Sequence, residues 1–164
     1  MSVTPDGSAL YVADGPTLRR VDLTTLAVET VAGVPGMPGY EDGVGDAARL
    51  GFLIHSSVFS ADGATLYLSD RSNDTLRAFD AATGAVSSIA GAPYPGFDAI
   101  HVDGIGTDAR FSGLGGLVRV GETLYVADTF NASIRRVDLA TAAVTTVAGQ
   151  PGVEGSMDGV GTDA

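Results

Sequence analysis

Apolar and polar positions alternate in short blocks along this chain, most clearly between residues 123 and 149. Three runs rich in apolar residues are separated there by turn-forming residues, at 124–127, 134–137 and 143–148. Short runs of this kind between turn signals are typical of β-strands. The same pattern recurs at residues 65–91 and 9–33. The chain therefore contains an internal repeat, which indicates an architecture built from repeated units.

A tyrosine near the start of each copy and a glycine at its end fix the register of the repeat. Tyr11, Tyr67 and Tyr125 are spaced by 56 and 58 residues, and Gly33, Gly91 and Gly149 by 58 and 58. In the first copy, we predict a short strand followed by a turn at 5–7. Three further strands are then predicted at 9–13, 18–21 and 26–32. Short turns between successive strands favour an antiparallel meander of four strands.

Both faces of these predicted strands are apolar. Tyr11 and Ala13 point to one side, and Leu10 and Val12 point to the other, so both faces have to be covered. Repeated meanders covered on both faces are typical of β-propeller blades. We therefore predict an all-β chain that forms a single domain over residues 1–164, without any long helix. The four-stranded blades are expected near residues 2–33, 52–91 and 112–149.

Longer connections, rich in glycine, proline and aspartate, separate the predicted blades at 34–51, 92–111 and 150–164. The motif Asp-Gly-x-Gly recurs in them, at 42–45, 103–106 and 158–161. Glycine allows positive φ angles, and aspartate side chains accept bonds from nearby backbone N–H groups. We expect these loops to lack regular structure and to lead from the outer strand of one blade to the inner strand of the next. Small residues at 56–57 and 115–116 suit a crowded inner strand.

The pattern AG…DGxGxxARF…LYVADxxNxxIRxxD…VxTVAG resembles the NHL repeat family of β-propellers. It is carried by 103–111, 123–128, Asn131, Ile134, Arg135, Asp138 and 144–149. The first copy departs from it, because Asp14 and Leu18 are four residues apart where the other copies have six. The resemblance implies a propeller, usually six-bladed. Family members include protein-interaction scaffolds, RNA-binding modules, and lyases or lactonases with a metal in the central channel, so the fold alone does not assign a function.

The charge of the chain excludes some partners. Nine arginines and no lysine stand against twenty acidic residues, for a net charge of −11. Such a surface repels nucleic acid and anionic membranes. The chain has no cysteine, no signal-peptide pattern at its start and no apolar run long enough to cross a membrane. These features leave the cellular location undetermined, and no cofactor is predicted.

Residues that recur in every copy are expected to be structural, because each blade meets the same mechanical demands. Asp14, Asp70 and Asp128 recur, and so do Arg19, Arg77 and Arg135. We interpret them as turn-stabilising aspartates and ion pairs at the blade edge. The Asp-Gly-x-Gly loops lack the alternating carboxylates and the glutamate of a calcium loop.

Residues that occur only once are the candidates for a site. His55 lies near the start of an inner strand and His101 in the longest loop, and both are weak candidates for the central channel. Catalytic zinc usually needs three protein ligands, so two histidines fall short. No nucleophile elbow is present either.

Two function classes remain. The first is a non-enzymatic scaffold or binding module that uses the loop face for a protein or small-molecule ligand. Its aromatic and arginine anchors would be Tyr40, Arg71, Tyr94, Phe97 and Phe130, residue types that are enriched at binding hot spots. The second is part of a lyase or lactonase whose metal ligands lie mostly outside this chain.

Three blades cannot close a ring alone, because one apolar face stays bare at each end. We therefore predict half of a six-bladed propeller that pairs as a two-fold homodimer through its terminal blades. The competing interpretation is a segment of a longer propeller protein.

Overall fold

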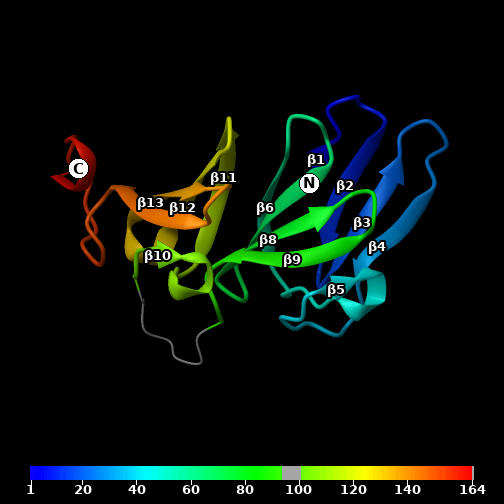
Figure 1. Cartoon of the computed structure of the whole chain (residues 1–164), viewed down its shortest axis with the longest axis horizontal. Helices are drawn as coiled ribbons and strands as arrows, with labels where there is room; N and C mark the ends of the chain where they lie inside the picture. The colour runs from blue at the N-terminus through cyan, green and yellow to red at the C-terminus, as the bar shows by residue number, and fades with distance from the viewer. Residues whose placement is uncertain (94–100, 164) are drawn as a thin grey trace.

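The computed structural model describes residues 1–93 and 101–163, and these form three twisted antiparallel sheets that stand side by side as propeller blades (Figure 1). The first blade has the strand order β1-β2-β3-β4. Its strands are β1 (Ser2–Val3), β2 (Ala9–Asp14), β3 (Thr17–Asp22) and β4 (Val28–Gly33). The all-β fold and the successive four-stranded meanders predicted from the repeat are confirmed.

The second and third blades each contain five strands, in the orders β5-β9-β8-β7-β6 and β10-β14-β13-β12-β11. The second comprises β5 (Gly43–Val44), β6 (Ile54–Phe59), β7 (Thr65–Asp70), β8 (Thr75–Asp80) and β9 (Ala85–Ala90). The third comprises β10 (Gly104–Ile105), β11 (Leu114–Val120), β12 (Thr123–Asp128), β13 (Ser133–Asp138) and β14 (Ala143–Ala148).

The fifth strands correct one prediction. The connections were expected to lack regular structure, but residues 43–44 and 104–105 pair with the outer strand of the following blade. Three-residue 3-10 turns follow them, η1 (Gly45–Ala47) and η2 (Gly106–Asp108). The equivalent turn at the end of the Asp-Gly-x-Gly motif at 158–161 is η4 (Gly161–Asp163). The glycines of the motif allow the backbone to extend and then turn within a few residues.

Each blade contributes one apolar face to the core between it and its neighbour. Tyr11 of β2 packs against Phe59 and Phe79 of the second blade, with ring centroids 5.3 and 5.8 Å apart. On the other side of the second blade, Leu76 and Tyr67 pack in the cluster that includes Leu124 and Val126 of the third. The inner strands β1, β6 and β11 lie next to one another (Figure 1).

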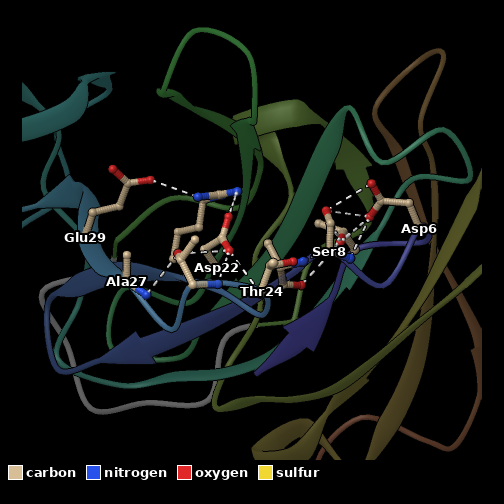
Figure 2. Close-up of polar contacts among 10 residues, drawn as sticks. Asp6, Ser8, Asp22, Thr24, Ala27 and Glu29 are labelled. Carbon is tan, nitrogen blue, oxygen red and sulfur yellow. Dashed lines mark hydrogen bonds and ion pairs between the residues drawn. The ribbon is translucent and has the colours of Figure 1, made fainter.

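The turns at the outer rim are stabilised by aspartates. Figure 2 shows the turn between β3 and β4, where Asp22 accepts bonds from the N–H of Thr24 and from Thr25, while Arg20 pairs with Glu29 at 3.2 Å. Bonds from Thr25 lower the pKa of Asp22. The same arrangement recurs at Asp80 and Asp138 in the other blades.

Candidate functional site

A charge cluster around the buried Arg135 joins the third blade to the loop that precedes it. The Arg135 guanidinium, fully buried, donates to Asp128 at 2.7 Å and to Asp103 at 2.6 Å. Asp128 also accepts bonds from the N–H of Ser112 and from Asn131. Asp103 further accepts bonds from both the N–H and the hydroxyl of Thr146. This cluster therefore fixes the loop, the turn and the outer strand together.

Burial and hydrogen bonding act in opposite directions on Asp103. Burial alone would raise its pKa, but bonds from Thr146 and Arg135 outweigh burial and hold the pKa below its usual value. The Asp103 carboxylate is therefore already hydrogen-bonded to groups of the same chain.

The second blade has the equivalent cluster. Arg77 donates to Asp42 at 2.8 Å and lies 3.8 Å from Asp70, while Ser88 donates to Asp42 through its N–H and its hydroxyl. Burial raises the pKa of Asp70, and bonds from the N–H of Gly51 and from Asn73 oppose that rise. Asp42 and Asp103, taken from the sequence as loop residues, are thus further ion-pair partners of the recurring arginines.

The first blade lacks this cluster. Asp14 is exposed, and within the described part of the chain the guanidinium of Arg19 has no ion-pair or hydrogen-bond partner. The ion pair expected between these two residues is not formed. The shorter turn removes the position that Asn73 and Asn131 occupy in the other blades, and no Asp-Gly-x-Gly strand lies on the outer edge of this sheet.

One loop on the face of the β7–β8 turn presents two apolar side chains to solvent. Phe52 is 62% exposed, and Leu53 beside it is also exposed. The backbone below them is tied to the turn, because Gly51 N–H donates to Asp70, Leu53 N–H donates to Ser72, and Arg71 N–H donates to the Leu53 carbonyl. Their position on the surface is therefore fixed by the fold rather than left to a free loop.

Arg71 and Phe130 meet on the same face. The Arg71 guanidinium lies 4.9 Å from the centroid of the Phe130 ring, which is 63% exposed. A guanidinium at this distance from a ring face makes a cation–π contact. Arg71 belongs to the second blade and Phe130 to the η3 turn (Thr129–Asn131) of the third, so the pair bridges two blades.

The other residues singled out in the sequence do not join this pair. Tyr40 is half-buried beneath Arg77, 4.9 Å from its guanidinium, and so has a packing role. His55 lies exposed on the inner strand β6. His101 bonds Thr146 through Nε2 at 2.9 Å, and its pKa is lowered by burial and by Arg135. Tyr94 and Phe97 lie outside the described residues.

Among residues 1–93 and 101–163, no three His, Cys, Asp or Glu side chains are grouped as a metal site. The same residues contain no helix long and apolar enough to cross a lipid bilayer.

Sequence reasoning missed Phe52 and Leu53. A usable signal existed, because the second copy has Phe52 and Leu53 between Gly51 and Ile54, where the third has only Gly113 between the equivalent Ser112 and Leu114.

Comparison with known proteins connects these repeats to named ones. The chain is 32% identical over 157 residues to NHL repeat-containing protein 2 of Bos taurus, an alignment that covers 88% of this chain and 21% of the relative. This chain belongs to the NHL-repeat family of β-propellers. No family model matches the sequence.

A second curated protein and a solved structure are also similar to the NHL-repeat chain. The chain is 32% identical over 151 residues to protein SUPPRESSOR OF QUENCHING 1, chloroplastic, of Arabidopsis thaliana, covering 85% of this chain and 14% of that protein. A solved protein of unknown function from Bacteroides thetaiotaomicron superposes with a TM-score of 0.76 at 20% identity, over 99% of this chain and 38% of that one. The NHL-repeat chain thus spans about a fifth or less of these two curated relatives.

Proposed function

We propose that this NHL-repeat chain is a non-enzymatic scaffold or binding module. The observation that carries the proposal is the Arg71–Phe130 pair, whose 4.9 Å contact holds an exposed aromatic ring at the junction of two blades. An arginine and an aromatic ring already held in place lose little conformational freedom on binding. Residues of these types dominate binding energy at protein interfaces.

The recurring charged residues support the same proposal. The arginines of the second and third blades are buried and engaged by two aspartates each, so these groups hold blades and loops together. The candidate anchors are instead the exposed side chains of Phe52, Leu53 and Phe130 together with the half-buried Arg71, which contacts the Phe130 ring and whose N–H binds the Leu53 carbonyl. The ligand that suits them is a peptide segment with apolar side chains and an acidic group that can approach Arg71.

A displayed random-peptide library tests this function. We expect enriched peptides whose affinity falls about tenfold or more in Phe130→Ala and Arg71→Ala, since loss of a central anchor removes most of the binding energy. The matched control is Leu26→Ala, which removes an exposed apolar side chain on the outer rim and should leave affinity unchanged. Absence of any enriched peptide, or equal loss in the control, would contradict the proposal.

A further inference from the structure

The outer edge of the first blade lacks a strand that the other two blades have. In the second and third blades, the two-residue strands β5 and β10 pair with the outer strand and cover Val86 and Val144, which are 2% and 1% exposed. Val28 occupies the same repeat position in β4 and is 53% exposed. This edge therefore offers unpaired backbone groups and an uncovered valine, a surface that readily takes up another strand.

Two polar side chains beside this edge also lack the partner that their equivalents have in the other blades. Arg19 stands where Arg77 and Arg135 stand, and Thr30 stands where Ser88 and Thr146 stand. In the other blades the arginine and the hydroxyl residue share one aspartate from the Asp-Gly-x-Gly loop. Within the described residues, neither the Arg19 guanidinium nor the Thr30 hydroxyl has a partner. One aspartate would satisfy both groups.

The third Asp-Gly-x-Gly segment, at 158–161, corresponds in sequence to the segments that supply β5, β10 and their aspartates. It is held against the third blade by a bond from Gly149 N–H to the Gly161 carbonyl at 3.2 Å, as Gly91 binds Gly106 at 3.1 Å. Unlike the two earlier segments, it pairs with no outer strand among the described residues. Asp158 is exposed and Val160 is 87% exposed.

The segment cannot reach the open edge of its own chain. β4 lies at one end of the molecule, and the C-terminal segment, red in Figure 1, lies at the other, beyond the third blade. The strand that completes the first blade therefore comes from another molecule or from a further blade.

We propose that a second copy of this chain supplies it, and that residues 158–161 of each copy complete the first blade of the other. By repeat equivalence with the pairs Gly43–Val86 and Val44–Ala85, Gly159 pairs with Val28 of the second copy and Val160 with its Ala27. Asp158 then binds Arg19 and Thr30 of that copy. The inference goes beyond the proposed binding function, because it concerns how two chains complete each other's blades and not what the face around Arg71 and Phe130 binds.

The apolar faces behind these strands fit the same arrangement. Leu18 and Leu76 are fully buried between blades, but Ile134 at their repeat position in the third blade is 39% exposed. Around it, Val118, Tyr125 and Ala127 line an open hollow. A second hollow, on the free face of the first blade, is lined by Val12, Arg19, Val21 and Val28. The two surfaces correspond to the two sides of the blade junctions already formed within the chain.

Both complementary surfaces belong to one chain, which favours a copy of that chain over an unrelated partner. Head-to-tail contacts of this type close into a ring when the rotations add up to a full turn, and two copies provide six blades.

An oxidative cross-link tests the contact, because the chain has no cysteine of its own. We expect the double variant Ala27→Cys with Val160→Cys to form a disulfide-linked dimer in high yield.

The matched control replaces Ile105 instead of Val160. Ile105 stands at the same position of an equivalent strand but already pairs with Ala143 of its own chain. The variant Ala27→Cys with Ile105→Cys should therefore stay uncross-linked. Equal cross-linking of both double variants, or none of either, overturns the inference.

A double-mutant cycle adds a second readout. Asp158→Asn and Arg19→Gln should each weaken dimerisation about tenfold or more, and the double variant should be little worse than either, because both remove one interaction. Additive losses contradict the pairing. If the unchanged chain binds peptide but stays a single copy, this inference alone is refuted. If the unchanged chain dimerises but binds no peptide, the binding function alone is refuted.

Discussion

Asp128 illustrates how a single side chain in this protein can hold three segments together. Its carboxylate accepts bonds from the N–H of Ser112 before β11, from Asn131 in the adjoining turn, and from Arg135 on β13. Asp70 has the equivalent role, whereas Asp14 is exposed. The recurrence of the aspartate and its pairing with the recurring arginine could be read from the sequence, but the second carboxylate that binds Arg135 could not. Asp103 lies 32 residues from Arg135, and only the folded chain brings them together.

Replacing Asp128 with alanine should destabilise the fold by roughly 1–3 kcal/mol, because it removes the acceptor of the Ser112 N–H and one of the two carboxylates that bind the buried Arg135. Urea unfolding measures the change. The control Asp108→Ala removes an exposed carboxylate of the preceding loop and should alter stability by less than about 0.5 kcal/mol. A fall in peptide binding without a fall in stability would instead make Asp128 a binding residue.

Asp6 has the clearest pH response. Bonds from Thr4 and Ser8 lower its pKa from 3.8 to about 2 (Figure 2). A lowered pKa in the folded state means that the contribution of Asp6 to stability is complete above its usual value and is lost as the pH falls toward 2.

An NMR titration of the Asp6 carboxyl group should therefore give a midpoint near 2. Thr4→Ala should move the midpoint upward, since Thr4 makes the largest lowering contribution. A midpoint near 3.8 in the unchanged protein would show that these bonds do not persist in solution.

At the scale of elements, the strands of the meanders were predictable because each combines an apolar run with turn residues and occurs three times. The strands β5 and β10 were not. Two residues carry no recognisable alternation, and they pair with strands about 40 positions further along the chain, so their existence depends on tertiary structure. The Arg71–Phe130 contact was missed for the same reason. Both residues were selected individually, but nothing in the sequence places one over the other.

The glycine that ends each blade gives a prediction at this scale. Gly149 has a φ of 81°, and a Cβ atom there would overlap the carbonyl oxygen of Ala132. Gly149→Ala should therefore destabilise the fold by about 2 kcal/mol or more, from backbone strain and the clash together.

Gly121 provides the comparison. Its φ is 59°, but a Cβ atom would meet nothing within 4 Å. Gly121→Ala should consequently lower stability by only about 1 kcal/mol, the strain of the left-handed conformation alone. Thermal or urea unfolding of the two variants measures the difference, and equal losses would show that the close approach at Gly149 is relieved by movement of the chain.

At the scale of the whole molecule, three blades leave two unequal ends. Counting partners only among residues 1–93 and 101–163, one end has an open strand edge beside an arginine without an ion-pair partner, and the other has an exposed aspartate without one. Each end reproduces one side of a junction that already exists between the blades of the chain. The repeat predicted pairing of the two terminal blades only in outline, because each leaves one apolar face bare, and it did not place Asp158 opposite Arg19.

The mass of the chain in solution tests this account most directly. One copy has a mass of 16.5 kDa, so the closed pair has twice that, about 33 kDa. Light scattering on the purified chain should give the mass of the pair, and Asp158→Asn should shift the population toward the single copy at low concentration. A folded species of 16.5 kDa at every concentration would contradict the account.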